Sequence, residues 1–285
     1  MRKVFLVVAF AFAMTGCMPT APVVKTGTID LPGTRLAYEQ RGDAIHTMVL
    51  IHGGLVDRRV WDLQAEPLAA MTGRRVIRYD QRGFGQSTRT PGPYSPVDDL
   101  LSLVNTLNVD RAELVGLSVG GQIAIEFALA HPERVEKLVL VSSSVTGMPS
   151  NDDPALRPIW VNARQGNVDA AIDLWMQHPL FKADVADPLY DSMMRTMLRD
   201  NLATWSDGAT YRDQQWGSPP AYGRLAEIHV PTLIIRGDHD VGDIVAVAEA
   251  MSHQIPGARL ITFPASAHHL NVQHPADFNR AVASF

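Results

Sequence analysis

A serine with a glycine two residues to either side is the feature of this sequence best suited to chemistry. The segment Gly116-Leu117-Ser118-Val119-Gly120 follows an apolar run, 112–115, and precedes a helical pattern that extends to residue 130. This order predicts a strand, a sharp turn and a helix, with the Ser118 hydroxyl exposed at the apex above the helix N-terminus. A serine held in this way can attack a carbonyl carbon and form an acyl-enzyme once a base takes its proton.

The elements that must hold this turn are short apolar runs that alternate with helical patterns. We expect a hairpin from Thr26–Asp30 and Arg35–Arg41 around Pro32-Gly33, and further strands at Thr47–His52, Arg75–Tyr79, Ala112–Val115, Lys137–Val141, Thr232–Arg236 and Ala258–Phe263. Helices are expected near Arg58–Ala70, Pro96–Leu107, Gly121–Ala130, Asp243–Gln254 and Pro275–Phe285. Such alternation predicts an α/β fold in which helices cover both faces of a mostly parallel sheet.

The alternation stops between residues 146 and 223. This stretch has no clear apolar strand, but it has helical patterns at Asp169–Gln177 and Leu189–Asn201 and four of the five tryptophans. Because a loop of this length without structure is improbable, we predict a helical cap at 146–223. The cap would be inserted into a core formed by residues 28–145 and 224–285.

Four more motifs accompany the serine turn, in a fixed order along the chain. They are His52-Gly53-Gly54, Asp80-Gln81-Arg82-Gly83-Phe84-Gly85-Gln86-Ser87, Gly237-Asp238-His239-Asp240, and Ala265-Ser266-Ala267-His268 followed by Pro275. Together they resemble the α/β-hydrolase fold over roughly 26–285. The sequence departs from the family at Ala265 and Ala267, where the family usually has glycines.

The resemblance implies a catalytic triad in the chain order serine, acid, histidine. The family's acid ends a Gly-x-x-Asp turn, which selects Asp240; Asp238 is interpreted as a partner of backbone N–H groups in that turn, and Asp243 as a carboxylate at a helix N-terminus. His268, just past the last expected strand, is the base that the resemblance implies. Its neighbour His269 is the second candidate.

The same resemblance implies an oxyanion hole and a substrate cleft. Its backbone N–H donors would be those of Val119 and Gly54, or of Leu55 if the loop is offset by one residue. His52 is expected to brace this loop, and Asp80 and Arg82 to organise the next one. We expect the side chains of Leu55, Trp61, Trp160 and Trp175 to line the cleft, with Arg157, Arg164 and Arg195 as candidates to hold a substrate carboxylate.

The first residues of the chain resemble a bacterial lipoprotein signal. Arg2 and Lys3 precede a short apolar stretch, and Thr15-Gly16 precedes Cys17, which is the only cysteine. We therefore predict a signal peptide at 1–16, a lipidated Cys17 and a tether at 17–27. The absence of an acidic residue after Cys17 favours the periplasmic face of the outer membrane. The alternative is an ordinary cleaved signal with an incidental cysteine.

Composition narrows the function further. The net charge is −5, no basic run is present, and no cluster of metal ligands is apparent, so we expect neither nucleic acid nor a metal, and no cofactor beyond water. The prediction is a serine hydrolase acting on a small to medium apolar carboxylic ester. The alternatives are an enol-lactonase or a carbon–carbon bond hydrolase of the same fold, and a non-catalytic ligand-binding lipoprotein, which would have no need of a complete triad.

Overall fold

The computed structural model describes residues 23–148, 153–183, 187–206 and 208–285. The predicted signal peptide, Cys17 and most of the predicted tether lie outside these residues. The end of the tether is wrong as predicted, because strand β1 (Val24–Leu31) already begins at Val24. It pairs antiparallel with β2 (Thr34–Arg41), and the hairpin turns at Gly33, whose φ of 74° is favourable for glycine.

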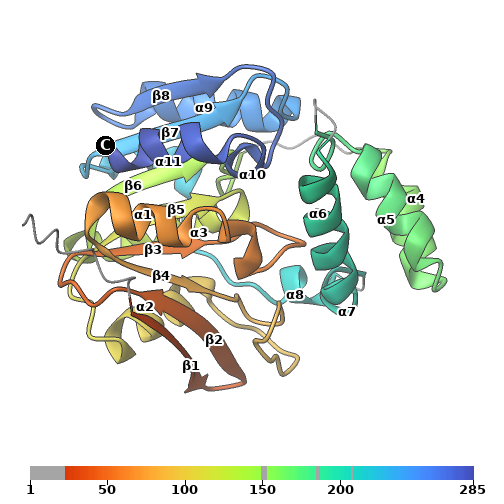
Figure 1. Cartoon of the computed structure of the whole chain (residues 1–285), viewed down its shortest axis with the longest axis horizontal. Helices are drawn as coiled ribbons and strands as arrows, with labels where there is room; N and C mark the ends of the chain where they lie inside the picture. Colours follow the sequence, from red (N-terminus) through yellow and green to blue (C-terminus); the bar gives the residue numbers. More distant parts are fainter. Residues whose placement is uncertain (1–22, 149–152, 184–186, 207) are drawn as a thin grey trace, which may run out of the picture.

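One eight-stranded sheet forms the centre, in the order β1-β2-β4-β3-β5-β6-β7-β8. The remaining strands are β3 (Thr47–Ile51), β4 (Arg75–Tyr79), β5 (Ala112–Leu117), β6 (Val135–Val141), β7 (Thr232–Gly237) and β8 (Arg259–Phe263). From β4 to β8 all neighbours are parallel, whereas β1 and β2 are antiparallel additions at one edge. The predicted fold class, with its mostly parallel sheet, is confirmed (Figure 1).

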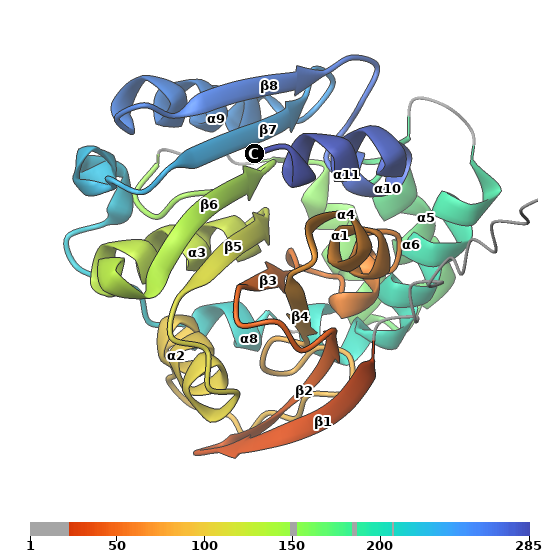
Figure 2. The same ribbon diagram turned by 60° about the vertical axis from the view of Figure 1, so that its left-hand side comes forward.

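Helices cover both faces of this sheet, as Figure 2 shows. On one face lie α1 (Ala65–Thr72), α10 (Leu270–Gln273) and α11 (Pro275–Ala283); on the other lie α2 (Pro96–Thr106), α3 (Val119–Ala130) and α9 (Gly242–Gln254). Strand β3 contributes side chains to the cores on both faces of the sheet. Met48 and Leu50 belong to the core under α1, and Val49 and Ile51 belong to the core under α3. Because alternate side chains of a strand face opposite sides, a doubly covered strand must be apolar throughout.

Local sequence explains where two of these helices begin. The Ser95 hydroxyl accepts the Asp98 N–H at 3.1 Å and caps α2, with Pro96 in the first turn, as expected. The helix predicted over Arg58–Ala70 is wrong, because the segment splits into a 3₁₀ helix, η1 (Arg58–Trp61), and α1. Pro67 accounts for this break, since proline is tolerated only in a first helical turn.

Between β6 and β7 the described residues form five α-helices: α4 (Leu156–Arg164), α5 (Val168–Gln177), α6 (Pro188–Asp200), α7 (Leu202–Ser206) and α8 (Ala209–Arg212). Figure 1 shows α4 to α7 grouped on one side of the sheet. The 3₁₀ helices η2 (Pro132–Arg134) and η3 (Ala221–Glu227) belong to the connections of the core. Among the described residues, no helix is long and apolar enough to cross a membrane.

The five inserted helices have an aromatic centre. The ring of Trp160 contacts Trp175 edge-on at 5.8 Å and Trp205 at 5.7 Å, and the last two lie 6.3 Å apart. Trp175 and Trp205 are fully buried, and their cluster is continuous with the core on the α1 face of the sheet. We refer to these five helices as the cap. Shared apolar packing therefore joins the cap to the sheet.

Candidate active site

Ser118 occupies the sharp turn between β5 and α3 that the sequence predicts. Its φ of 54° lies in the left-handed region, and its N–H donates to the Val141 carbonyl at 2.9 Å. The flanking glycines are required, because a Cβ on Gly116 would lie 2.3 Å from the Gly120 oxygen, and one on Gly120 2.2 Å from the Ile51 oxygen. The strained turn presents the hydroxyl beyond the end of the sheet, above the first N–H groups of α3.

Asp240 and His268 follow β7 and β8, the last two strands of the sheet. The Nδ1 atom of His268 lies 2.9 Å from Oδ1 of Asp240 and 3.1 Å from Oδ2, and both residues are buried. Asp240 also accepts the Val241 N–H at 2.8 Å. Burial alone would raise the pKa of Asp240, but His268 and these hydrogen bonds hold the pKa of the carboxyl below its usual value. An ionised Asp240 thus fixes His268 with Nδ1–H toward it and Nε2 free.

Of the other two aspartates, Asp243 lies as the sequence analysis interpreted it, whereas the hydrogen bond of Asp238 is to the loop after β8 and not within its own turn. Asp238 accepts the Ser266 N–H at 3.2 Å, and Asp243 is in the first turn of α9. His269 is buried, with its ring 4.8 Å from that of Phe181, whereas the hydrogen bonds of Asp240 go to His268. Burial lowers the pKa of His269 to about 3, with a further contribution from His268, so its imidazole is neutral.

His52 braces the loop that follows β3. The Gln81 N–H donates to its Nε2 at 2.8 Å, and its Nδ1–H donates to the Gly53 carbonyl at 2.7 Å. Burial lowers the pKa of His52, which keeps the imidazole neutral with its proton on Nδ1. The loop passes close to the nucleophile, since a Cβ on Gly53 would lie 3.2 Å from Cβ of Ser118. His52 therefore acts on the loop and does not line the pocket described below.

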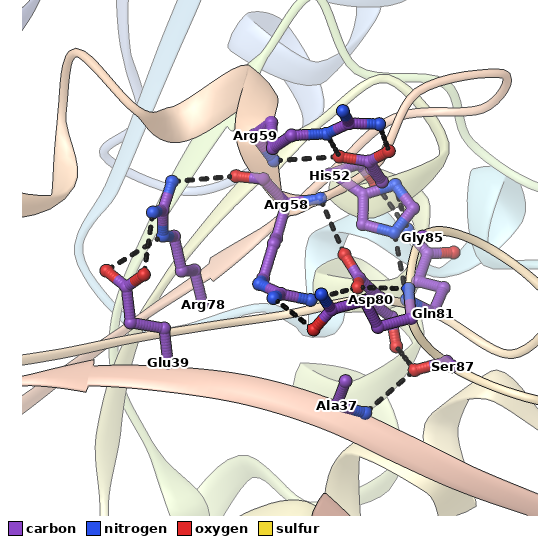
Figure 3. Close-up of polar contacts among 12 residues, drawn as sticks. Ala37, Glu39, His52, Arg58, Arg59, Arg78, Asp80, Gln81, Gly85 and Ser87 are labelled. Carbon is purple, nitrogen blue, oxygen red and sulfur yellow. Dashed lines mark hydrogen bonds and ion pairs between the residues drawn. The ribbon is translucent and has the colours of Figure 1, made fainter. Parts of the chain in front are cut away.

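A network of hydrogen bonds and ion pairs packs against the loop that follows β3 (Figure 3). Asp80 accepts the N–H groups of Arg58 and Gln86 at 2.9 and 2.8 Å and forms an ion pair with the Arg58 guanidinium. Ser87 donates to the Asp80 carbonyl at 2.7 Å and accepts the Ala37 N–H at 2.8 Å, which ties the network to β2. Burial raises the pKa of Asp80 despite the opposing effect of Arg58.

Arg82 organises its own loop, residues 80–87, which follows β4. Its guanidinium makes two hydrogen bonds to Asp99 of α2, at 2.7 and 3.0 Å, and one to the Pro32 carbonyl at 3.0 Å. Neither Asp80 nor Arg82 lines the pocket that contains Ser118. Both residues therefore position the loop, as the sequence analysis expected, and stay away from the reacting groups.

Ser118 and His268 open into one pocket of about 200 Å³ between core and cap. It is lined by Gly53, Gly54, Leu55, Ser118, Val119, Trp160, Leu180, Phe181, Tyr211, His268 and His269. Among the described residues, the N–H groups of Gly54 and Val119 have no hydrogen-bond acceptor, whereas the Leu55 N–H donates to the Tyr211 hydroxyl oxygen at 3.0 Å. The sequence left Gly54 and Leu55 as alternative donors from this loop, and the N–H of Gly54 is the one that is free to bind an oxyanion.

This arrangement brings together a nucleophile, a base and an acid, and comparison with known proteins shows the family to which the chain belongs. Residues 46–275 match a model of the alpha/beta hydrolase fold. The chain belongs to the α/β-hydrolase family. It is 30% identical over 278 residues to the 2-hydroxy-6-oxononadienedioate/2-hydroxy-6-oxononatrienedioate hydrolase of Burkholderia vietnamiensis, covering 92% of this chain and 93% of that one.

Two solved structures show the range of chemistry among similar α/β-hydrolases. An enol-lactonase from Burkholderia xenovorans has a TM-score of 0.73 and 25% identity, covering 90% of this chain and 98% of that one. A thermophilic esterase from Thermogutta terrifontis has a TM-score of 0.72 and 26% identity, covering 93% and 97%. The fold therefore serves more than one hydrolytic reaction, and the site must distinguish between them.

The structure corrects two of the four residues expected to line the pocket of this hydrolase. Leu55 and Trp160 line it, but Trp61 and Trp175 do not. Trp61 has 0% exposure and packs against Phe278 at 6.0 Å, because η1 directs it into the core under α1. Trp175 lies beneath Trp160 in the centre of the cap, where the apolar face of α5 places it.

Sequence reasoning missed three pocket residues of this α/β-hydrolase: Leu180, Phe181 and Tyr211. Leu180-Phe181 stands alone after His178-Pro179 at the end of α5, and an isolated apolar pair next to a proline was the available signal. Tyr211 belongs to the one-turn helix α8 and gave no periodic pattern.

The three arginines considered for a substrate carboxylate also lie elsewhere. Arg195 pairs with Asp173 and Asp191 on the cap surface, Arg164 donates to the Ser206 carbonyl at 3.3 Å, and Arg157 is exposed on α4. Among the described residues, no arginine or lysine lines the pocket of this hydrolase.

Proposed function

We propose that this chain is a serine hydrolase that cleaves a small to medium uncharged carboxylic ester through an acyl-enzyme on Ser118. The observation that carries the proposal is the hydrogen-bonded pair of Asp240 and His268, which shares a small pocket with a serine on a strained turn. Nucleophile, base and orienting acid are the parts that acyl transfer requires.

Each group has a defined task in this reaction. His268 takes the Ser118 proton on Nε2, since Nδ1 faces Asp240, and the ionised Asp240 stabilises the imidazolium that forms. Ser118 attacks the ester carbonyl, and the N–H groups of Gly54 and Val119 stabilise the negative charge on the carbonyl oxygen. His268 then protonates the departing alcohol. Water, activated by the same imidazole, hydrolyses the acyl-enzyme and restores the free serine.

The pocket supports an uncharged substrate. Burying a carboxylate without a cationic partner is costly, and no arginine or lysine among the described residues lines this pocket. The name of the Burkholderia vietnamiensis relative specifies a dioate, a substrate with two carboxylates. An ester with an apolar acyl group fits the lining of Leu55, Leu180 and Phe181 better than such a dianion.

Hydrolysis of p-nitrophenyl esters of increasing acyl length tests this function. We expect turnover with a preference for short chains such as acetyl and butanoyl, because the cavity is only about 200 Å³. Ser118→Ala should lower kcat by at least about 10³-fold. Ser252→Ala, which changes a half-buried serine on α9 outside the pocket, is the matched control.

Two results would contradict the proposal. The first is ester turnover that survives Ser118→Ala. The second is a folded protein that hydrolyses none of the esters but opens a lactone or cleaves a carbon–carbon bond, which would move the assignment to those reactions.

We also propose that the chain is exported and anchored by lipid at Cys17, on the periplasmic face of an outer membrane. The support is the basic start, the short apolar stretch and the single cysteine after Thr15-Gly16. Expressed in a Gram-negative host, the full chain should fractionate with membranes and a Cys17→Ser variant should not. An unchanged distribution of the variant would contradict the lipid anchor.

A further inference from the structure

We propose that the Tyr211 hydroxyl is a third hydrogen-bond donor to the substrate oxygen, supplied by the cap to the oxyanion site of the core. This inference rests on the proposed function and adds a catalytic residue to it. It starts from three observations: the position of the hydroxyl on the oxyanion loop, the fixed path of the segment around Tyr211, and the unused proton of the hydroxyl.

The Tyr211 hydroxyl lies directly on the oxyanion loop. Its oxygen accepts the Leu55 N–H at 3.0 Å, and a Cβ on Gly54 would lie 3.0 Å from the same oxygen. Gly54 therefore has no side chain at a point where even a methyl group would crowd the tyrosine. Tyr211 also lines the pocket together with Ser118 and Val119. The phenol thus reaches the place where the carbonyl oxygen of an ester is bound.

One aromatic contact holds the phenol ring in place, and a second connects that contact to His52. Phe84, which is buried, lies 6.2 Å from the ring of Tyr211 and 5.4 Å from the ring of His52. Because His52 braces the oxyanion loop, this stack links the tyrosine ring to the same structure that positions the N–H donors. A donor fixed before the substrate binds costs no reorganisation when charge develops.

The backbone around Tyr211 is also attached to the core. The Tyr94 N–H donates to the Asp213 carbonyl at 3.0 Å, the Gln215 N–H donates to the Tyr94 carbonyl at 2.7 Å, and the Tyr94 hydroxyl donates to the Thr210 carbonyl at 3.3 Å. An ion pair between Arg89 and Asp213 adds to these contacts. The segment 210–215 is therefore held on both sides of Tyr211, although Tyr211 itself belongs to the cap helix α8.

The proton of this hydroxyl is available for a substrate. A tyrosine hydroxyl has one donor and two acceptor positions, and the Leu55 N–H uses an acceptor position. Among the described residues, no acceptor is found for the Tyr211 O–H. Burial raises the pKa of Tyr211 well above its usual value, so the proton stays on the oxygen at neutral pH.

These facts explain how Tyr211 would act in the reaction. When Ser118 attacks, the carbonyl oxygen gains negative charge, and the Tyr211 O–H donates to it beside the N–H groups of Gly54 and Val119. Tyr211 forms and breaks no covalent bond. The Leu55 N–H, by donating to the phenol oxygen, makes the O–H a better donor, since linked hydrogen bonds polarise one another.

A Tyr211→Phe variant tests the proposal, because it keeps the ring and removes only the hydroxyl. We expect kcat/KM for p-nitrophenyl butanoate to fall by about 10²-fold with little change in KM, as for loss of one oxyanion donor. Binding of a trifluoromethyl ketone, which forms a charged adduct with the serine, should weaken by the same factor. Binding of the matched methyl ketone should not change.

Tyr222→Phe is the matched control. It removes the hydroxyl of a half-buried tyrosine on η3 that does not line the pocket. This variant should keep the wild-type kcat/KM. An unchanged or increased kcat/KM in Tyr211→Phe would overturn the proposal, and so would an equal loss of affinity for both ketones, which would indicate a structural role only.

Labelling of Ser118 by a fluorophosphonate separates this inference from the proposed function. Its phosphoryl oxygen gains charge at the same place, whatever the natural substrate is. A wild type that is labelled but hydrolyses no ester would contradict the ester assignment, and slower labelling of Tyr211→Phe would still support the role of Tyr211. A wild type that is neither labelled nor active would contradict both proposals.

Discussion

At the scale of single residues, the hydrogen bonds between His268 and Asp240 determine which imidazole nitrogen is free to act as a base. Nδ1 lies within 3.1 Å of both carboxylate oxygens, so Nε2 is the atom left for the serine. The Val241 N–H and His268 keep the carboxylate ionised despite its burial. A neutral side chain of the same shape would remove both the fixed tautomer and the stabilisation of the imidazolium.

Asp240→Asn is therefore expected to lower kcat by up to about 10⁴-fold, the loss known for the equivalent change in a serine protease triad. KM should change little, because Asp240 does not line the pocket. Asp238→Asn is the control, since its side chain accepts the Ser266 N–H at 3.2 Å and an amide oxygen can accept this N–H too. Steady-state kinetics of the two variants decide the matter: equal kcat values would exclude Asp240 as the triad acid.

A functional residue could be predicted from the sequence where its position is fixed by a short motif around it. Ser118, Asp240 and His268 were found because each stands in a short motif directly after a strand, where backbone geometry fixes the side chain. Tyr211 could not be found in this way, because its partner Leu55 lies 156 residues earlier in the chain. Trp61 and Trp175 were wrongly expected in the pocket because composition does not reveal the direction of a side chain.

At the scale of elements, the turn between β5 and α3 depends on the close passage of three backbones. A Cβ on Gly120 would lie 2.2 Å from the Ile51 oxygen and 2.6 Å from the His52 oxygen, both of which are main-chain atoms. Main-chain atoms in the centre of a sheet cannot move aside without disturbing β3 and β5. The glycine thus permits the turn that exposes Ser118.

Gly120→Ala is expected to lower the free energy of unfolding by about 3 kcal/mol or more, because the added methyl group overpacks a rigid site. Gly223→Ala is the matched control, since a Cβ there would meet no atom within 4 Å and its φ is not positive. Urea denaturation followed by tryptophan fluorescence gives both values. Two variants of equal stability would show that the turn tolerates a side chain.

Elements with strong periodic signals were predicted well, and short or broken ones were not. The strands from β3 to β8 and the helices α2, α3, α5, α6, α9 and α11 lie close to their expected positions. The segment 58–70 was read as one helix because its apolar spacing continues through the break before α1, and α8 and α10 have only four residues each. A single turn is too short for a period to show.

At the scale of the whole molecule, two buried neutral histidines make stability depend on pH. Burial lowers the pKa of His52 and lowers that of His269 to about 3, whereas the pKa of a histidine in an unfolded chain is about 6.5. Below that pH the unfolded chain binds a proton that the native state excludes. The contribution of the two histidines to the free energy of unfolding should therefore be complete above about pH 6.5 and decline as the pH falls.

We expect each of these histidines to contribute a slope of up to about 1.4 kcal/mol per pH unit between roughly pH 6.5 and 5. His269→Phe keeps a ring beside Phe181 and removes one proton site, so its stability should fall less steeply over this range. His253→Gln, at an exposed position on α9, should keep the wild-type slope. Urea denaturation at several pH values measures the slopes, and a slope unchanged by His269→Phe would contradict the assigned neutral state.

The position of the cap against the core was the part of the molecule that no pattern predicted. The alternation of strands and helices fixes the sheet, because parallel strands with short crossovers have few possible arrangements. The cap meets the core through single contacts such as Asn201 to Asp57 at 2.9 Å and Tyr211 to Leu55 at 3.0 Å. Neither pair is visible in local sequence, and both shape the pocket or its surroundings.

The most direct test of the account is a carbamoylation experiment with p-nitrophenyl dimethylcarbamate, whose enzyme adduct is hydrolysed slowly. The account predicts a burst of one nitrophenol per protein chain and a carbamoyl group on the peptide that carries Ser118, with neither in Ser118→Ala. An adduct on another residue, or ester turnover by a protein that forms no adduct, would contradict the role of Ser118 as the nucleophile.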